Sequence, residues 1–510
     1  MNTKALRQKV LDLAIHGKLV PQNPNDESAT VLLEKIRAEK AEKIKKGLPS
    51  GRRGELKADK KDSFIFVGSD KRHYEQFADG TVKDIEDEIP FDVPEGWAWC
   101  RLNQIYNFID YRGVTPNKID SGVPLVTAKN VKNGYIDYSI SEFISKADYE
   151  NRQGRGSPRK GDLLFTTEAP LGNCAIADLD IFSPGQRIIT FQQYTNTEFL
   201  NNKLFLYFIL SDKFQELIYN KRTGTTVTGI KAEKLKLIFI PLPPKKEQDS
   251  IVSVIENIYL HINSIEKSKL DLQEIIKQTK SKILDLAIHG KLVPQDPNDE
   301  PAEELLKRIA TSDNRPYKKI EEEEPYELPS NWSWCFLGDI CSKIKRGKSP
   351  KYVDKSSIMA FAQKCNHKDG PTSLEKALYI DESTLKKYPE EEKMQFNDIV
   401  INSTGTGTLG RVGIFNCSIP NDVNGVYPDS HVTTVRILPE IDKLYCYYFI
   451  KNKQSYLETM GEGSTNQKEL KPDTISSLCF PLPPYPEQKR IVFKIEELFS
   501  SLETIVSNLD

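Results

Sequence analysis

LDLAIHGKLVPQNPNDE, from Leu11 to Glu27, returns as LDLAIHGKLVPQDPNDE from Leu284 to Glu300. Sixteen of the seventeen positions are identical, and only Asn23 and Asp296 differ. One copy lies almost at the start of the 510-residue chain, and the other lies just past its middle. Repetition over such a distance indicates that a structural unit occurs twice in the chain.

Further matches extend the repeat over both halves of the chain, at separations of 234 to 240 residues. The two copies of the opening string are instead separated by 273 residues. The matched pairs are VPEGWAWCRLNQI (93–105) with LPSNWSWCFLGDI (328–340), RGVTP (112–116) with RGKSP (346–350), NKLFLYFILSD (202–212) with DKLYCYYFIKN (442–452), and PLPPKKEQDSIVSVIE (241–256) with PLPPYPEQKRIVFKIE (481–496).

The two separations together indicate a circular arrangement. By the shorter one the C-terminal Asp510 corresponds to Leu270, and by the longer one Met1 corresponds to Glu274. The second copy of one segment is therefore cut, and its halves lie at opposite ends of the chain. This arrangement predicts that the two termini lie close together in space.

The cut segment has the pattern of a coiled coil. Its seam positions alternate at spacings of four and three, with apolar residues at all of them except the polar Lys269 and Thr279, which is typical of a heptad seam. Thirty-six residues at about 1.5 Å each would make a rod of about 54 Å. The two terminal segments continue the pattern and would together imitate the unbroken central helix, in an antiparallel arrangement. The alternative is a set of ordinary amphipathic surface helices. The seam positions are Ile251, Ile255, Ile258, Ile262, Ile265, Leu272, Ile276, Ile283 and Leu286, then Ile491, Ile495, Leu498, Leu502, Ile505 and Leu509, and finally Leu6, Val10 and Leu13.

The two long units between these helices read as mixed α/β. GDLLFTT (161–167) and NDIVINST (397–404) are typical of buried strands, and NKLFLYFILSDKFQELI (202–218) is typical of a helix. We expect the W-x-W tryptophans at the start of each unit to pack in the core, and base stacking is the alternative. We predict an α+β protein with a helical segment at 1–36, a linker insert at 37–92, a first domain at 93–244, a central helical region at 245–309, an acidic linker at 310–327, a second domain at 328–484 and a C-terminal helix at 485–510.

A basic stretch precedes the first domain. Between Lys35 and Lys61 the chain has eleven lysines or arginines against four acidic residues. Two interpretations remain open: a solvated linker, or an arm that follows DNA phosphates by charge alone. The second half of the chain has no equal counterpart to this stretch.

Composition excludes several classes of protein. The net charge is −2, so a DNA-binding face must be local or completed by partners. The sequence contains no run of 18 apolar residues, so no transmembrane helix is predicted. The first residues lack the apolar region of a signal peptide. The eight cysteines form no C-x-x-C pair, which favours reduced thiols in the cytoplasm over disulfides or a zinc site.

The chain also lacks a convincing catalytic motif. GTGTLG (405–410) fits a dinucleotide-binding pattern, but a strand-like stretch follows it where a helix is required, so we predict a hairpin. LPPY (482–485) resembles the motif of adenine methyltransferases, but Leu482 cannot accept a hydrogen bond from the target amine. The six histidines show no metal-ligand spacing, and we expect structural roles for His16 and His289.

Four features together resemble a known family: the duplicated AIHGKLVPQ-PNDE string, the PLPP…EQ helix starts, the W-x-W-C segments, and the RGVTP and RGKSP loops. Over essentially its full length, the chain resembles the DNA-specificity subunits of type I restriction-modification systems. Each short motif is weakly specific, whereas the string together with the duplicated layout is specific.

The resemblance implies two target-recognition domains, each reading one half of a split, asymmetric DNA site. Long helices would form an antiparallel, pseudo-twofold coiled-coil spacer that fixes the distance between the readers. It further implies a non-catalytic cytoplasmic subunit without a cofactor of its own. Two modification subunits would methylate adenine N6 with S-adenosylmethionine, and restriction subunits would cleave DNA with ATP and Mg²⁺. A structural scaffold that reads no DNA and a stand-alone enzyme remain the alternatives.

Candidate DNA contacts lie in three pairs of corresponding loops. Arginine and lysine suit guanine and phosphate, and asparagine and glutamine suit adenine edges. For each residue an ordinary loop or capping role is the alternative. The candidates are Arg112 and Thr115 with Arg346, Lys348 and Ser349; Lys129 and Asn130 with Gln363, Lys364 and Asn366; and Thr226 and Lys231 with Asn466, Gln467 and Lys468.

Overall fold

The computed structural model divides the chain into two compact units, Met1–Ser268 and Lys269–Asp510. The long helix α8 (Lys245–Ile288) runs through the boundary between them. The closeness of the two termini stays a prediction from the sequence. The described residues are 2–46, 63–113, 115–194, 199–223, 228–312, 320, 325–368, 371–405, 407–463 and 468–508, without the side chains of 385 and 387.

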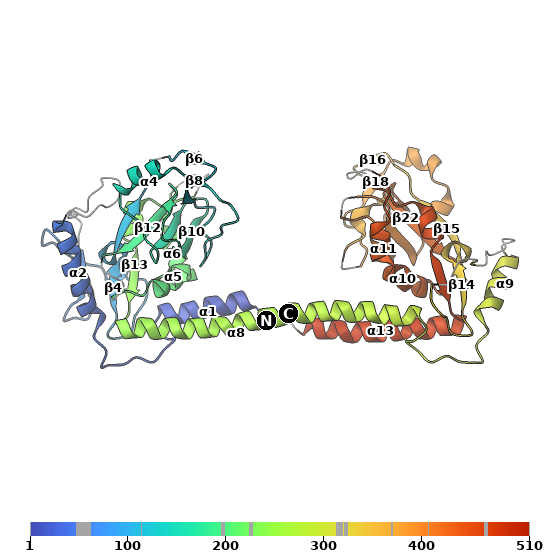
Figure 1. Ribbon diagram of the computed structural model, residues 1–510, viewed down its shortest axis with the longest axis horizontal. Helices are drawn as coiled ribbons and strands as arrows, with labels where there is room; N and C mark the ends of the chain where they lie inside the picture. The colour runs from blue at the N-terminus through green and yellow to red at the C-terminus, as the bar shows by residue number, and fades with distance from the viewer. Residues whose placement is uncertain are drawn as a thin grey trace. The chain divides into compact units, whose positions relative to one another are not determined.

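In the first unit, helix α1 (Thr3–Ile15) lies antiparallel to the first part of α8 (Figure 1). Arg7 donates to Asn263 at 2.7 Å and to Glu266 at 3.0 Å, and its guanidinium lies 4.8 Å from the centre of the Tyr259 ring. Beyond the end of α1, Asp26 lies 3.9 Å from Lys246 at the start of α8. The two helices therefore run in opposite directions.

In the second unit, helix α13 (Tyr485–Ser507) takes the corresponding place on the second part of α8. Lys280 donates to Glu503 at 3.0 Å and lies 5.0 Å from the centre of the Phe499 ring. Near the other end of the pair, Arg490 of α13 donates to Asp299, beyond the end of α8, at 2.6 Å. This pair of helices is antiparallel as well.

The predicted seam is buried where these helix pairs overlap and exposed where they end. Ile251, Ile255 and Ile262 are almost completely buried, but Ile265 is 45% exposed. Ile505 near the end of α13 is likewise 45% exposed. Leu509 lies outside the described residues. The seam is thus continuous only in the overlaps, and the prediction of burial is wrong for Ile265, Ile505 and Leu6, which is 38% exposed.

Two four-stranded sheets and one strand pair build the first domain. The main sheet has the antiparallel order β10-β9-β12-β5, and the second sheet has the order β11-β7-β8-β6, with β11 parallel to β7. Strand β4 pairs with β13. The bounds are β4 (Ala98–Arg101), β5 (Tyr106–Asp110), β6 (Lys118–Ile119), β7 (Val123–Val126), β8 (Phe143–Ile144), β9 (Leu163–Thr167), β10 (Leu171–Ile176), β11 (Ser183–Pro184), β12 (Ile188–Gln193) and β13 (Phe239–Leu242).

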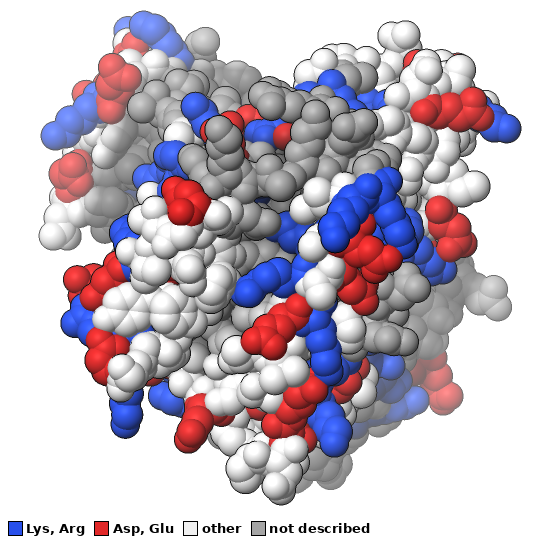
Figure 2. Space-filling model, turned by 90° about the vertical axis from the view of Figure 1, so that its left-hand side faces the viewer, with Lys and Arg blue, Asp and Glu red and all other residues white. Residues whose placement is uncertain are grey.

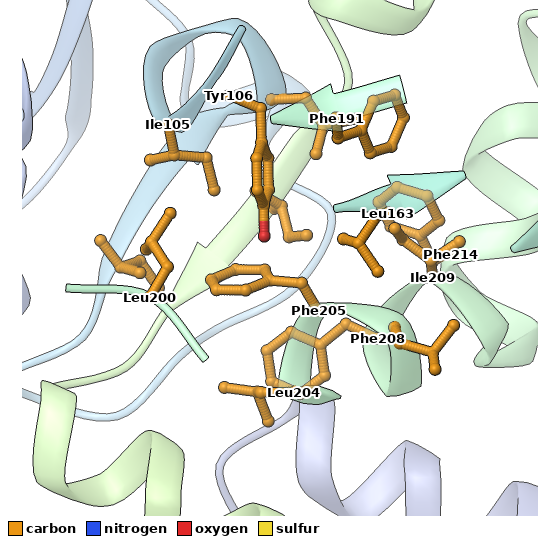
Figure 3. Packing of buried hydrophobic residues seen from close by; sticks show 14 of the residues in the cluster. Ile105, Tyr106, Leu163, Phe191, Leu200, Leu204, Phe205, Phe208, Ile209 and Phe214 are labelled. Carbon is orange, nitrogen blue, oxygen red and sulfur yellow. The ribbon is translucent and has the colours of Figure 1, made fainter. Parts of the chain in front are cut away.

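Helix α5 (Asn202–Leu210) covers this main sheet and brings the aromatic core together (Figure 3). The Phe205 ring meets the Tyr106 ring edge-on at a centroid distance of 5.7 Å, and Tyr106 lies 5.8 Å from Phe191 of β12. All five residues of β9 are buried, as expected for a central strand covered on both faces. The remaining helices are α3 (Leu102–Ile105), α4 (Lys146–Gln153), α6 (Asp212–Asn220) and α7 (Ala232–Lys236).

The second domain repeats this architecture. Its sheets have the orders β15-β22-β19-β20 and β16-β18-β17-β21, and β14 pairs with β23. The shared topology confirms the α+β prediction and the duplication. The bounds are β14 (Ser333–Phe336), β15 (Cys341–Arg346), β16 (Tyr352–Val353), β17 (Ile358–Phe361), β18 (Leu378–Ile380), β19 (Asp398–Asn402), β20 (Val412–Phe415), β21 (Gly425–Pro428), β22 (Val432–Ile437), β23 (Cys479–Leu482), α9 (Ala302–Ser312), α10 (Lys443–Asn452), α11 (Gln454–Thr459) and α12 (Pro472–Ser476).

The duplicated string forms the same joint between helix and domain in both units. After α1, Gly17 has φ +65°, and a Cβ atom there would lie 2.3 Å from Pro94 Cγ. After α8, Gly290 has φ +64°, and its Cβ would lie 2.4 Å from Pro329 Cγ. Only glycine combines this backbone with this close approach. The string is therefore repeated because each copy makes the same tight contact.

Histidine and tryptophan complete each joint. The Nδ1 atoms of His16 and His289 both lie 2.7 Å from the carbonyl oxygen four residues earlier, which confirms their structural role. Trp97 Nε1 donates to Glu247 at 2.9 Å, and Trp332 Nε1 donates to Glu487 at 3.0 Å. Trp97, Trp99 and Trp332 are buried, as predicted for the W-x-W segments, whereas Trp334 is half-buried.

The first unit contains a sheet within the stretch 37–92 that was expected to be a linker. Helix α2 (Ala29–Lys45) extends into this stretch, and β1 (Ser63–Val67), β2 (His73–Phe77) and β3 (Val82–Asp84) form an antiparallel sheet. Buried Glu75 binds this sheet to the domain, because Arg101 donates to both of its carboxylate oxygens at 2.6 and 2.7 Å. Composition alone hid the alternating strands. Most of the basic stretch, 47–62, lies outside the described residues.

Candidate nucleic-acid interface

In the first domain, five loops meet at one end of the main sheet. We call the described residues of 110–116, 126–130, 167–171, 185–187 and 223–231 the first loop cluster. Gln186 Nε2 donates to Thr115 Oγ1 at 2.6 Å, and Gly185 N donates to Val126 O at 2.7 Å. Ile230 N donates to Thr167 O at 2.9 Å, which ties in the last loop. The cluster therefore joins all three loops that the sequence predicts for this domain.

The same five loops meet in the second domain. The second loop cluster consists of the described residues of 346–350, 361–366, 402–411, 429–431 and 462–471. Ser349 Oγ donates to Ser430 Oγ at 3.0 Å, and Asp429 N donates to Phe361 O at 3.0 Å. Leu470 N donates to Ser403 O at 2.9 Å, in the place of the contact between Ile230 and Thr167. Two matching clusters carry different side chains on one framework.

Among the predicted residues of the first cluster, Arg112 has a fixed orientation. Its Nε and Nη2 donate to the carboxylate of Asp110, which is 6% exposed, at 2.6 to 3.0 Å. Such a fork leaves the remaining N–H donors of the guanidinium pre-oriented. Thr115, Lys129 and Lys231 are exposed. Thr226 lies outside the described residues.

In the second cluster, Arg346 is held in a similar way. It donates to Ser430 O and forms an ion pair with Glu469. Lys348 lies 3.3 Å from Glu392 and near the face of the Tyr388 ring. Ser349, Lys364 and Lys468 are exposed, Gln363 accepts from Thr408 Oγ1 at 3.0 Å, and Asn466 and Gln467 lie outside the described residues.

The two predicted asparagines face inward. Asn130 is 2% exposed, accepts from Thr127 N at 2.9 Å, and donates to the carbonyl oxygens of Asp137 and Ile140 at 2.8 Å. Asn366 is 1% exposed and donates to Asn402 Oδ1 at 3.1 Å and to a backbone carbonyl. Their amide groups hold the loops, so the prediction that they meet adenine edges is corrected.

Charge at the clusters is mixed. Arg112, Arg346 and Lys348 each pair with a carboxylate, and the face of the molecule in Figure 2 likewise shows lysine and arginine side chains among aspartates and glutamates. Burial raises the pKa of Asp429 in the second cluster, against the opposing effects of the His431 N–H and the charges of His431 and Arg346. Such sites suit reading by oriented donors and acceptors better than attraction of phosphates by a uniform field.

Sequence reasoning placed no candidate contact in two of the five loops of each cluster. One is the hairpin turn, 167–171 or 402–411, and the other is the turn 185–187 or 429–431. The turns 185–187 and 429–431 follow β11 and β21 and precede β12 and β22. Each turn comes directly after a proline, Pro184 or Pro428. The two turns are 244 residues apart, whereas the matching motifs are 234 to 240 residues apart, so a comparison at the common separation does not align them. The signal that could have found them is the shared proline before a buried strand.

The GTGTLG stretch lies in the turn of the antiparallel β19–β20 hairpin, as predicted. Within the described part of the chain, no group of three or more His, Cys, Asp or Glu residues could hold a metal ion. In the same part, no helix is long and apolar enough to cross a membrane.

Comparison with known proteins identifies the duplicated domain. The family model described as "Type I restriction modification DNA specificity domain" matches residues 94–274 and again residues 329–508. The chain belongs to this family. Each of the two matched segments contains one loop cluster and an adjoining long helix. The resemblance inferred from the sequence is confirmed.

Relatives of this specificity-domain protein match over most of their length. The EcoEI specificity subunit of a type I restriction enzyme from Escherichia coli is 25% identical, covering 99% of this chain and 90% of the relative. The EcoAI specificity subunit from the same species is 26% identical, covering 98% and 89%. A solved chain, described under complex assembly and conformational transition of the type I R-M system, superposes with a TM-score of 0.52 at 17% identity, covering 82% of this chain and 94% of that one. The structural likeness shows the shared fold.

Proposed function

We propose that this chain is the DNA-specificity subunit of a type I restriction-modification enzyme. Each specificity domain reads one half of a split, asymmetric DNA site, and the helices keep the two readers at a fixed separation. The observation that carries this proposal is that the family model matches twice, and each matched domain presents the same five loops with different side chains. Equal frameworks with different surfaces suit two related half-sites.

The exposed and half-buried polar members of the clusters are the proposed DNA contacts. Arg112 and Arg346, each held by a carboxylate, suit guanine edges or phosphate, and exposed Thr115 and Ser349 suit either. The lysines at 129, 231, 364 and 468 suit the phosphate backbone. Thr226, Asn466 and Gln467 remain proposals from sequence alone.

Exposed apolar side chains on the helices support docking of partner proteins. Leu260 and Leu270 of α8 are 67% and 66% exposed, and Phe493 of α13 is 71% exposed. Apolar side chains that stay exposed on a folded surface suit protein contacts. Two modification subunits would bind the duplicated helical surfaces, as expected for pseudo-twofold repeats. They would supply adenine N6 methylation with S-adenosylmethionine, and restriction subunits would supply ATP-dependent cleavage. This chain contributes recognition in the cytoplasm and no catalytic group.

The test is co-expression with a modification subunit, followed by genome-wide mapping of N6-methyladenine. We expect a bipartite motif, and exchange of residues 93–244 for the corresponding domain of another member should change one half of it only. If the exchange left both half-sites unchanged, the proposal would fail. A scaffold would direct no sequence-specific methylation, and methyl transfer by the purified chain alone would indicate an enzyme instead.

A further inference from the structure

We propose that Arg187 and His431, at equivalent positions of one turn, are specificity-determining residues that each contact a base edge in one half-site. This inference rests on the proposed function and identifies two contacts that the loop motifs did not suggest. It concerns the turns 185–187 (Gly-Gln-Arg) and 429–431 (Asp-Ser-His).

The first turn is the point at which the loops of its cluster join. Gly185 N donates to Val126 O, and the side chain of Gln186 donates to Thr115. Arg187 O accepts from the backbone N–H of Thr167 at 2.9 Å. One three-residue turn thus contacts the RGVTP loop, the 126–130 loop and the end of β9.

The second turn makes the same set of connections. Asp429 N donates to Phe361 O, and Ser430 contacts the RGKSP loop through Ser349 and Arg346. His431 O accepts from Ser403 N at 2.8 Å. A turn that is fixed by three neighbouring loops holds its exposed side chain in a defined place, which base recognition requires.

Burial follows the same order in both turns. The first residue is buried, the second is half-buried and the third, Arg187 or His431, is exposed. Each exposed residue contacts the tip of the neighbouring hairpin: Arg187 Nε lies 3.0 Å from Glu168 Oε1, and His431 Nδ1 lies 2.6 Å from Thr404 Oγ1. Glu168 and Thr404 each follow the corresponding strand, β9 or β19. The exposed side chains therefore have equivalent anchors as well as equivalent backbones.

The chemistry of the two residues predicts different readings. The ion pair engages Nε of Arg187, and the guanidinium retains terminal N–H groups that match O6 and N7 of guanine. Its side chain is 56% exposed, so those groups are accessible. His431 uses Nδ1 on Thr404 and retains Nε2 for a single hydrogen bond, whose direction depends on the tautomer. We expect a guanine preference in the first half-site and a weaker preference in the second.

The test uses the full chain with its modification subunit and maps methylation for Arg187→Ala and Arg187→Lys. Arg187→Ala should reduce discrimination at one position of one half-site by about 10- to 100-fold. Arg187→Lys keeps the charge but loses the fork, so it should relax the same position. His431→Ala should relax one position of the other half-site by a smaller factor.

Arg72→Ala is the matched control, because Arg72 is an exposed arginine of the same unit, 2.8 Å from Asp84 and outside the cluster. It should leave both half-sites unchanged. If Arg187→Ala lowers methylation equally at all sites and both Arg187 variants keep every base preference, the residue contacts phosphate and the inference is overturned. If Arg187→Ala abolishes methylation, the motif methylated by the Arg187→Lys variant tests the inference instead. A relaxed base at one position supports a base contact, and an unchanged motif overturns it. Failure of the proposed function is distinct, since the wild-type complex would then show no bipartite motif.

Discussion

Replacement of Gly290 by alanine tests whether the duplicated string exists for the joint. Gly290 follows α8 with φ +64°, and a Cβ there would lie 2.4 Å from Pro329 Cγ, 3.1 Å from Pro329 Cδ and 3.2 Å from Trp332. The proline ring is rigid and cannot move away as the end of a flexible side chain would. We therefore expect Gly290→Ala to displace the start of the second domain from the helix end.

The cost has two parts. An alanine in the left-handed region costs about 1–2 kcal/mol, and overpacking against a rigid neighbour costs about 1–3 kcal/mol more. The matched control is Gly407→Ala in the same unit, where φ is +77° and no atom lies within 4 Å of the added Cβ. The φ angle of Gly407 is farther from the left-handed optimum than that of Gly290, so an alanine at Gly407 costs at least as much backbone energy. The excess for Gly290→Ala measures the steric contact.

Urea unfolding followed by tryptophan fluorescence is the assay. With Trp97 and Trp99 replaced by phenylalanine, the emission reports Trp332 and Trp334 of the second unit only, because the chain has four tryptophans. Gly290→Ala should lower the unfolding free energy by about 1–3 kcal/mol more than Gly407→Ala. Equal shifts for the two variants would refute the view that close packing at the joint explains the glycine.

Other predictions concern pH, a buried ion pair and the helix. Burial raises the pKa of Asp162 from 3.8 to about 6. The stability that the protonated carboxyl contributes is therefore fully present below about pH 4 and is lost as the pH rises through about 6. Asp162→Asn retains an oxygen acceptor for Gln192 and should increase the free energy of unfolding at pH 7 by up to about 3 kcal/mol. In urea titrations, the free energy of unfolding should depend less on pH between pH 4 and 6 than in the wild type. A loss of stability at pH 7 would contradict this prediction. Arg101→Met leaves Glu75 buried without its partner and should cost about 3–5 kcal/mol in thermal unfolding, whereas Arg101→Met with Glu75→Leu should recover most of it; no recovery would disprove the coupling. Four residues inserted after Lys269 should change the distance between methylated half-sites or abolish assembly, and an unchanged distance would remove the proposed ruler.

The repeat predicted the two domains and their helices because residues at the joint are restricted by contacts that both copies make. It could not say which positions of the seam would be buried. Ile265 continues the heptad but is 45% exposed, because burial depends on how the partner helix packs, which the spacing of apolar residues does not describe. The insert sheet was missed because the basic composition of its neighbourhood outweighed the alternation in SFIFV and HYEQF.

For the candidate interface, the structure brings the predicted loops together but buries two of the predicted side chains. Asn130 and Asn366 have the chemistry to read adenine, but the same amide groups satisfy loop carbonyls, and a linear motif does not distinguish the two uses. Arg187 and His431 share no residue type, so a search for matching strings passes over them. Their equivalence becomes visible only through the contacts that their turns make.

This contrast separates positions that build the fold from positions that select a target. The joint keeps sixteen of seventeen residues between the copies, including the glycine whose Cβ would overlap a proline. The turn between β11 and β12 instead keeps its backbone contacts, while Gly-Gln-Arg in one copy stands opposite Asp-Ser-His in the other. If the turns served only packing, the exposed third residue would be free to be any polar type, and it would not need an anchor on the hairpin tip. Both copies nevertheless provide that anchor, Glu168 for an arginine and Thr404 for a histidine, and a matched pair of side chain and anchor is expected where the direction of a donor matters.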